Sequence, residues 1–334
     1  MVETLIRTET KENPLLTPMN GKRSVKIFSG RANIPLSKEI CEYLKLPLGK
    51  INIAPFADGE LYVQIEESVR GCDVFLIQPT CPPVNENIME LLIVLDALKR
   101  ASAEKITIVI PYYGYGRQDR KAAGREPITA KLVADLLCHA GTTRILALDL
   151  HATQIMGFFD VLVDHLFATP ILVKYIESLN LKDIVIVSPD VGGVTRARAF
   201  AKKLNSPIAI LDKRRPVDKH NTVEVINIIG EIKGKTCIMV DDMIDTAGTI
   251  TQGAALLAKE GAKEVLACST HAVLSGPAKE RIDKSPISTL IVTNSIQVPK
   301  EKAPKKLKVL SVAPLLAEAI KRIHLDDSVS EMFA

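Results

Sequence analysis

The stretch CIMVDDMIDTAGTI, which spans Cys237–Ile250, decides the fold. Apolar residues run without a break to Val240, acidic and small residues follow, and the next segment, residues 251–259, has the composition of a helix. A continuous apolar run is typical of a strand that is covered on both faces. A strand that passes through a short polar loop into a helix is the repeating unit of α/β proteins.

The same unit recurs on either side of this stretch. Short apolar runs predict strands at residues 25–28, 74–78, 106–110, 145–148, 184–187, 208–211, 237–240, 265–268, 290–292 and 309–312. The clearest helix is Pro127–Ala140, with Gly141 placed to end it. Its apolar stripe comprises Ile128, Leu132, Val133, Leu136 and Leu137. The alternation predicts an α/β fold made of two similar doubly wound parallel-sheet domains.

The domain boundary is predicted between residues 167 and 168, where Leu166–Pro170 links the two halves. The first domain is then 24–167 and the second is 168–334. Residues 1–23 are polar, contain proline and have no period, which predicts a flexible leader. Ligands of doubly wound sheets bind beyond the C-terminal ends of the strands, so the loops at those ends hold the candidate site residues.

Composition excludes several classes of protein. Hydrophobic residues make up 47% of the 334 residues, as in globular proteins, and no apolar run reaches the roughly 18 residues of a membrane span. Lys plus Arg number 43 against 39 for Asp plus Glu, a balance that does not indicate a nucleic-acid partner. The six cysteines lack the close spacing of zinc or redox motifs. A reducing cytoplasm is therefore the expected compartment.

The loop within Cys237–Ile250 has the chemistry of a sugar-phosphate site. Small residues let backbone N–H groups approach a phosphate, and the start of a helix adds a favourable field. Thr246 and Thr249 offer hydroxyl donors. Carboxylates repel phosphate, so Asp241 and Asp242 suit the hydroxyls of a ribose. An ordinary turn with an acidic helix cap would explain only Asp245 and Thr246.

Two loops of the first half carry further candidates. The segment Phe56-Ala57-Asp58-Gly59-Glu60 presents an aromatic ring before a tight turn, suited to stacking on a base, although alone it reads as a turn. Pro111–Arg125 combines three tyrosines with Arg117, Gln118, Arg120 and further cations. Such a loop is suited to closing over a polyphosphate, and as a bare charge run it reads as a solvated loop.

Three more polar segments follow predicted strands. His151 comes two residues after Asp149, and Asp190 lies in a Gly-containing turn that suits a hard cation. The segment Asp212–Pro216 supplies consecutive cations, including Lys213 and Arg215, which suit an anionic transition state. Taken alone, each segment also fits a structural role without function: a packed histidine, a turn or a solvated basic loop.

At Cys237–Ile250 the chain resembles the phosphoribosyltransferase superfamily, which implies sheet domains of that type. From Val25 to the C-terminus its motifs, in order, resemble the ribose-phosphate pyrophosphokinase family of the phosphate-dependent class. The resemblance implies an active site between two domains, with Mg²⁺ near His151 and Asp190. The implied ATP-binding residues are Phe56, Asp58, Gly59, Glu60, Arg117, Gln118 and Arg120. The implied residues for ribose 5-phosphate are Arg215, Asp241, Asp242, Asp245, Thr246, Ala247, Gly248 and Thr249, and the implied catalytic cations are Lys213 and Arg215.

The resemblance also implies assembly and regulation. Members of the family form hexamers whose ATP sites are completed across subunits, and phosphate activates while ADP inhibits. The C-terminal tail contributes to that control, which makes Ser328 and Ser330 candidate regulatory residues. This chain departs from the family in residues 1–23, which exceed the usual family start, and in the tail Ser328–Phe333, where relatives more often have a Tyr-Leu pair.

The implied reaction transfers the β,γ-pyrophosphoryl group of MgATP to the C1 hydroxyl of ribose 5-phosphate, which gives phosphoribosyl pyrophosphate and AMP. Two alternatives stay open. A base-transferring phosphoribosyltransferase would need only the Cys237–Ile250 loop and would leave the Asp58 and Arg117 motifs unexplained. A catalytically silent regulatory homologue would be favoured by loss of Lys213 or Asp190, and both are present. A P-loop kinase is excluded by the lack of a GxxxxGK[ST] motif.

Overall fold

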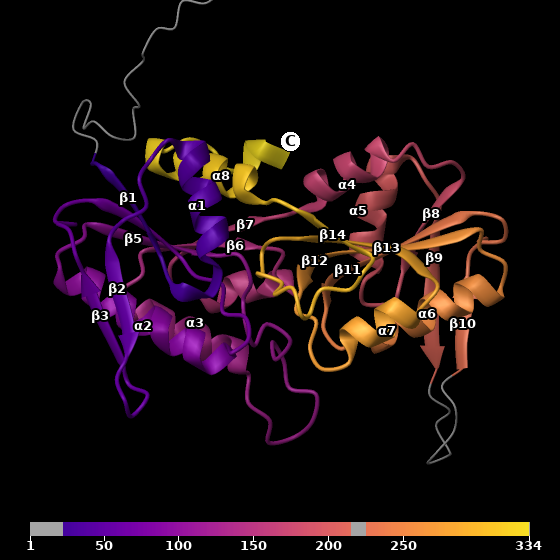
Figure 1. Cartoon of the computed structure of the whole chain (residues 1–334), viewed down its shortest axis with the longest axis horizontal. Coiled ribbons are helices and arrows are strands. Elements are labelled where there is room, and N and C mark those ends of the chain that lie inside the picture. Colours follow the sequence, from indigo (N-terminus) through magenta and orange to yellow (C-terminus); the bar gives the residue numbers. More distant parts are fainter. Residues whose placement is uncertain (1–22, 215–224, 334) are drawn as a thin grey trace, which may run out of the picture.

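The computed structural model describes residues 23–214 and 225–333. Two sheets lie side by side with helices on both faces (Figure 1). The first sheet is parallel throughout and has the order β1-β4-β5-β6-β7. Its strands are β1 (Val25–Ser29), β4 (Asp73–Ile77), β5 (Lys105–Ile110), β6 (Arg144–Leu148) and β7 (Leu162–Leu166).

The second sheet has the order β10-β9-β8-β11-β12-β13-β14 and is parallel except for the β9–β10 pair at its edge. Its strands are β8 (Ile184–Ser188), β9 (Ile208–Arg214), β10 (Val225–Ile229), β11 (Thr236–Ile244), β12 (Glu264–Ala272), β13 (Ile287–Thr293) and β14 (Leu307–Leu310). A separate antiparallel hairpin joins β2 (Ile51–Pro55) to β3 (Leu61–Ile65). The predicted α/β architecture with parallel sheets is confirmed.

Helices cover the sheets in two layers. The α-helices are α1 (Ile34–Leu44), α2 (Val84–Arg100), α3 (Thr129–Ala140), α4 (Thr169–Ser178), α5 (Val194–Leu204), α6 (Gly248–Lys259), α7 (Ala278–Lys284) and α8 (Ala313–Leu325). Short 3₁₀ turns are η1 (Arg31–Asn33), η2 (Thr153–Phe158) and η3 (Ser330–Phe333). In Figure 1, α1, α8, α4 and α5 lie above the sheets, and α2, α3, α6 and α7 lie below. None of the described helices is long and apolar enough to cross a membrane.

The hydrophobic core is divided into clusters because side chains alternate between the two faces of each strand. In β11, Ile238 and Val240 join a cluster that also contains residues of α1, α4, α5 and α8, so this upper core runs across both sheets. Cys237 and Met239 point the other way, into a cluster with α6 and α7. A third cluster packs α2 and α3 under the first sheet. The period of two in strands explains why neighbouring residues enter different cores.

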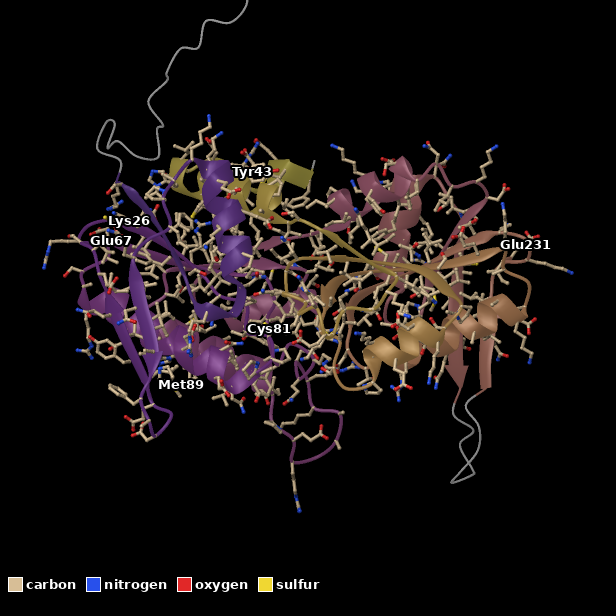
Figure 2. All side chains as sticks on the ribbon, in the orientation of Figure 1. Lys26, Tyr43, Glu67, Cys81, Met89 and Glu231 are labelled. Carbon is tan, nitrogen blue, oxygen red and sulfur yellow. The ribbon has the colours of Figure 1, made fainter. Side chains whose placement is uncertain are left out.

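The C-terminal strand ends of the two sheets meet in the middle of the molecule. The side-chain amide of Asn33, after β1, donates to the carbonyl of Asn294, after β13, at 2.8 Å. Thr270 of β12 donates its hydroxyl to the Asp149 carboxylate, after β6, at 2.6 Å. Cys81, labelled near the centre of Figure 2, belongs to a small apolar cluster at this junction. The segments after β1, β6 and β13 and the strand β12 therefore meet between the halves.

The C-terminal helix returns to the first half. Helix α8 packs against α1, and His324 Nδ1 lies 2.9 Å from a carboxylate oxygen of Asp73, the first residue of β4. The predicted boundary at 167/168 follows the change of sheet, but in space α8 lies beside the first domain. The predicted leader, residues 1–23, falls outside the described residues except for Arg23.

The predicted stripe on Pro127–Ala140 is wrong in part. Helix α3 begins at Thr129, and its buried face consists of Ala130, Val133, Ala134 and Leu137. Ile128, Leu132 and Leu136 are 38%, 55% and 42% exposed. Small alanines allow close packing on the sheet, so the bulkier aliphatic side of the helix faces outward.

Other differences concern the ends of elements. Helix α6 begins at Gly248 rather than residue 251, and β14 ends at Leu310 rather than residue 312. The prediction lacked β7, whose half-exposed residues Asp164 and His165 break the apolar run, and it lacked the edge strand β10. Edge strands carry fewer buried residues, so their apolar signal is weak.

Candidate active site

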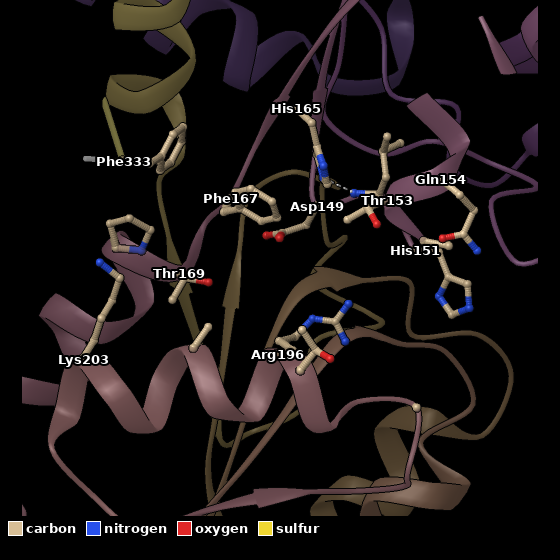
Figure 3. A pocket seen from close by; sticks show the side chains of 16 residues that line it. Asp149, His151, Thr153, Gln154, His165, Phe167, Thr169, Arg196, Lys203 and Phe333 are labelled. Atoms are coloured by element: carbon tan, nitrogen blue, oxygen red, sulfur yellow. Dashed lines mark hydrogen bonds between the residues drawn. The ribbon is translucent and has the colours of Figure 1, made fainter. Parts of the chain in front are cut away.

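A cavity of about 610 Å³ opens where the loop after β6 faces helix α5. Its lining includes Asp149, His151, His165 and Phe167 from the first half and Arg196 from α5, and Phe333 of the tail closes one end. Figure 3 shows Arg196 on helix α5 below His165, with His151 on the loop at one side. The cavity is therefore bounded by both halves of the chain.

A short contact joins the two halves at this cavity. His151 Nδ1 lies 2.7 Å from Oδ2 of Asp242, which belongs to β11 of the second sheet. The imidazole is part-exposed, whereas the Asp242 side chain is almost fully buried. The hydrogen bond to Asp242 raises the pKa of His151, although burial acts in the opposite direction.

Arg196 holds the two adjacent acids. Its Nη1 atom lies 3.4 Å from one carboxylate oxygen of Asp241 and 3.4 Å from Oδ1 of Asp242. Burial acts to raise the pKa of Asp242, but the hydrogen bond from His151 and the charge of Arg196 outweigh it and hold that pKa well below its usual range. Burial and the adjacent negative charge of Asp242 raise the pKa of Asp241. The pair therefore differs in how readily each acid ionises.

Asp242 is more deeply buried than Asp241. Strand β11 continues to Ile244, so the acids lie within the strand, where successive side chains point to opposite faces. Asp242 points toward His151 and is buried, with protein groups near both of its carboxylate oxygens. Asp241 remains part-exposed.

The loop before His151 has a constrained backbone. Asp149 adopts a φ of 41°, in the left-handed region that non-glycine residues seldom adopt. Its carboxylate accepts from the Ala168 amide at 2.9 Å and from Thr270, and its carbonyl lies 3.1 Å from His271 Nε2. These contacts over-determine the backbone and fix the position of His151 two residues on.

The predicted sugar-phosphate loop forms the N-terminal end of α6. Ala247 adopts a left-handed φ of 59° and α6 begins at Gly248, which leaves unpaired backbone N–H groups at this end. Thr246 and Thr249 are exposed. The left-handed residue is Ala247 and not Gly248, whose backbone lies outside that region. Glycine at 248 is therefore not required by a special φ, and a Cβ added there would lie 3.4 Å from Arg281 Nη1 and 3.9 Å from Thr246 Oγ1.

The basic loop of the first half reaches this sugar-phosphate loop. Arg117 Nη1 lies 2.9 Å from a carboxylate oxygen of Asp245. Gln118 accepts a hydrogen bond from the Thr129 hydroxyl, and its backbone carbonyl accepts from the Ala130 amide at the start of α3. Arg120 is exposed. The structure thus brings Arg117, Asp245, His151 and Asp242 to one region.

Other predicted residues are not brought together here. Within residues 23–214 and 225–333, no hydrogen bond or ion pair joins the hairpin tip Phe56–Glu60 to the cleft. Phe56 is exposed and meets Tyr62 edge to face at 6.0 Å, and Asp58 accepts from the Glu60 amide. Strand β9 carries Lys213, whose side chain lies outside the described atoms, and Arg215 lies outside the described residues.

The structure shows the surroundings of the predicted metal ligand Asp190 and of the predicted regulatory tail. Asp190 is exposed after β8, and one oxygen accepts from the Gly193 amide at 2.8 Å. The described parts of the chain contain no cluster of three or more histidine, cysteine or acidic side chains that could hold a metal. In the tail, Ser328 and Ser330 contact each other at 2.9 Å, and Phe333 meets Phe167 edge to face at 5.9 Å.

Sequence reasoning missed Arg196. A signal was present, because Arg196 lies in the first turn of α5, where the helix dipole disfavours a cation. A cation at this position is unfavourable unless an acidic group compensates it. In the structure, Asp241 and Asp242 are the acidic partners of Arg196. The role of Asp149 had no sequence signal beyond its place before His151.

Comparisons with known proteins indicate the same family for both halves of the chain. The N-terminal domain of ribose phosphate pyrophosphokinase matches residues 25–141, and the phosphoribosyl synthetase-associated domain matches residues 211–334. The chain is 62% identical to ribose-phosphate pyrophosphokinase of Bacillus subtilis over 314 residues, 94% of this chain and 98% of that one. It is 58% identical to ribose-phosphate pyrophosphokinase of Nostoc sp., over 97% of this chain and 98% of that one. The crystal structure of phosphoribosylpyrophosphate synthetase from Mycobacterium smegmatis is similar, with a TM-score of 0.86 and 44% identity, over 90% of this chain and 99% of that one.

Proposed function

The chain belongs to the ribose-phosphate pyrophosphokinase family and shares its activity, and from that premise we propose that the cleft between the two sheets is where the reaction takes place. In this cleft the β,γ-pyrophosphoryl group of MgATP passes to the C1 hydroxyl of ribose 5-phosphate. The observation that carries the proposal is the contact of Arg117 with Asp245, which joins the basic loop of one half to the sugar-phosphate loop of the other.

Ribose 5-phosphate binds at the start of α6. The backbone N–H groups and the hydroxyls of Thr246 and Thr249 donate to the 5-phosphate, and the helix dipole favours its charge. Asp241, which remains part-exposed, accepts from the ribose hydroxyls. Asp245 lies between this loop and the basic loop and is the second acceptor.

The basic loop holds the triphosphate through Arg117, Gln118 and Arg120. Arg117 is paired with Asp245, yet the Arg117 side chain is 54% exposed. Exposed pairs of this kind contribute only about 0–1 kcal/mol, so a phosphate can replace the carboxylate at little cost. A shift of Arg117 from Asp245 to ATP also frees Asp245 for the sugar.

The residues present fit a Mg²⁺ site in which the protein and the substrate phosphates both supply ligands. His151 offers Nε2 while Asp242 holds its Nδ1, an arrangement common among metal-bound histidines, and Asp190 offers an exposed carboxylate. Two protein ligands suffice for Mg²⁺ when substrate phosphates and water complete the set. When bound, the ion neutralises charge on the phosphoryl oxygens. His151 and Asp190 fix the position of that charge. Lys213, which lies in β9, and Arg215, which lies outside the described residues, add cations to stabilise the transition state.

Assembly and regulation form part of the proposal. The hairpin tip Phe56–Glu60 is exposed on its own subunit, which supports its role in completing the ATP site of another copy. The exposed aliphatic row Ile128, Leu132 and Leu136 supports association, with a homohexamer as the proposed form. Phosphate and ADP are the proposed effectors, with Ser328 and Ser330 of the tail contributing. The cytoplasm is the proposed compartment, because all six cysteines are free thiols.

Isotope transfer tests the reaction. ATP that carries ³²P in its β position is incubated with Mg²⁺, ribose 5-phosphate and the full-length protein. Transfer of the pyrophosphoryl group moves the label into the sugar product and leaves unlabelled AMP. Label that stays in a nucleotide, as ADP, would contradict the proposal and indicate transfer of the γ-phosphoryl group alone.

A further inference from the structure

Asp242 uses both of its oxygens on protein groups. Oδ2 lies 2.7 Å from Nδ1 of His151, and Oδ1 faces Nη1 of Arg196 at 3.4 Å. The Asp242 side chain is 4% exposed, whereas that of His151 is 37% exposed. The carboxylate is therefore covered by the protein, while the part-exposed imidazole lines the cavity.

This contact fixes which imidazole nitrogen carries the proton. An ionised carboxylate only accepts hydrogen bonds, so His151 must donate Nδ1–H to it. In the neutral ring the lone pair then lies on Nε2. Among residues 23–214 and 225–333, no side chain or backbone group forms a hydrogen bond with Nε2 of His151. The available lone pair thus belongs to the nitrogen that Asp242 does not hold.

We propose that Asp242 is a positioning residue that holds His151 as its Nδ1–H tautomer and keeps the Nε2 lone pair free for a divalent cation. The inference rests on the proposed function of His151 as a metal ligand. It differs from the role predicted from the sequence, in which Asp242 accepts a ribose hydroxyl. Arg196 completes the arrangement, because its charge holds Oδ1 and stops the carboxylate from turning away from His151.

Substitution of Asp242 by asparagine would show whether the tautomer of His151 depends on this carboxylate. Its amide has the shape of the carboxylate but only one accepting oxygen, and the other end is an NH₂ donor. The cation of Arg196 takes the oxygen, so the NH₂ group faces Nδ1 of His151. Nδ1 must then accept, and the proton moves to Nε2. A comparable Asp-to-Asn change in the trypsin triad leaves the geometry intact and imposes the wrong tautomer.

The test combines a spectroscopic and a binding readout on the full-length protein. The chain has six histidines, so ¹⁵N-histidine labelling gives few imidazole signals, which His151→Ala assigns. Spectra are recorded without ligand at a pH that keeps the ring neutral, and Mn²⁺ affinity is measured by electron paramagnetic resonance. The variants are Asp242→Asn and, as matched control, Asp241→Asn, whose carboxylate does not face His151.

Wild type should show a protonated Nδ1, and Asp242→Asn a protonated Nε2. Loss of an outer partner of a ligand typically weakens metal binding by about 10–100-fold, and we expect that loss for Mn²⁺ in Asp242→Asn. Asp241→Asn should leave the tautomer and the Mn²⁺ affinity unchanged. The double variant Asp242→Asn with Arg196→Met should restore Nδ1–H, because the amide oxygen is then free to turn toward His151.

The outcomes separate this inference from the proposed function. A wild-type spectrum with Nε2 protonated overturns the inference even if Asp242→Asn does not fold. An unchanged tautomer and Mn²⁺ affinity in Asp242→Asn also overturn it. Unchanged Mn²⁺ affinity in His151→Ala instead overturns the proposed metal site, whatever the tautomer. A raised KM for ribose 5-phosphate in Asp242→Asn, with normal Mn²⁺ affinity, would restore the ribose-binding role and contradict the inference.

Discussion

Two histidine–aspartate pairs join distant parts of the chain, and they differ in what surrounds them. His151 and Asp242 meet at 2.7 Å beside the cavity, and His324 and Asp73 meet at 2.9 Å between α8 and β4. The side chains of the second pair are 3% and 7% exposed. The first pair has Arg196 as a third member, whereas the other atoms of the second pair, His324 Nε2 and Asp73 Oδ1, are buried with no partner in the described chain.

The comparison indicates that the role of a histidine–aspartate pair depends on the surroundings of Nε2, the imidazole nitrogen that does not contact the aspartate. In His324 that nitrogen is sealed in the protein, so the pair only holds α8 to the sheet. The His151 side chain is 37% exposed, and under the proposal above its Nε2 is the nitrogen that binds a ligand. We therefore expect changes at the first pair to alter the reaction and changes at the second to alter stability.

The largest expected effect is on stability at the sealed pair. His324→Ala leaves Asp73 buried without its partner, and breaking a buried pair in this way typically lowers the free energy of unfolding by about 3–5 kcal/mol. Denaturant unfolding at fixed protein concentration measures it. His139→Ala, an exposed histidine on α3, is the control and should change stability by no more than about 0.5 kcal/mol. Equal stability of both variants would remove the structural role of the pair.

The cleft side should instead lose rate without losing stability. Lys213→Ala removes a proposed stabilising donor, which usually lowers kcat by about 10²–10³-fold, with a much smaller change in KM. Steady-state kinetics beside thermal melts measure both properties. A near-normal kcat would show that Lys213 does not stabilise the transition state.

A smaller effect is expected at the sugar-phosphate loop. Thr249→Ala removes one hydrogen bond to a charged group, worth about 1.5–3 kcal/mol, so KM for ribose 5-phosphate should rise while KM for ATP changes little. Thr251→Ala is the matched control, because that hydroxyl donates to the Ala247 carbonyl and not to the cleft. If Thr249→Ala weakened only ATP binding, the loop would be assigned to the wrong substrate.

The smallest expected effect is on pH dependence. Burial lowers the pKa of His271 below 6.5, so the unfolded chain takes up a proton before the folded chain does. Its stabilising contribution is present above pH 6.5 and is lost as the pH falls below that value. His151 has the opposite sign, since its pKa is raised in the folded chain. His271→Gln should therefore flatten the fall in melting temperature below pH 6.5, and an unchanged slope would show that this histidine does not titrate as described.

Much of the fold could be predicted because buried strands leave long apolar runs. Each predicted strand overlaps an observed one, and the loops after β5, β6, β8 and β11 carry many of the candidate residues. The side of α3 could not be predicted from bulk alone, because alanines at 130 and 134 pack closely and leave Leu132 outside.

The site was less predictable because its contacts cross between the halves. The apolar run of β11 ends at Val240, but pairing with β12 continues through Met243 and His271. That extension places Asp241 and Asp242 within the strand, where Asp242 meets His151 and both acids lie near Arg196. Neither fact is written in the local sequence, since both depend on a strand and a loop far away along the chain.

Product analysis of His151→Ala and His324→Ala, at a temperature where both are folded, tests the central claim most directly. The account predicts that wild type and His324→Ala form AMP and phosphoribosyl pyrophosphate in equal amounts at similar rates. It predicts that His151→Ala is slower by about 10²–10³-fold, the usual effect of losing one group that stabilises the transition state. Equal losses in the two variants would contradict the distinction between the pairs, and a normal rate in His151→Ala would place the reaction away from this cleft.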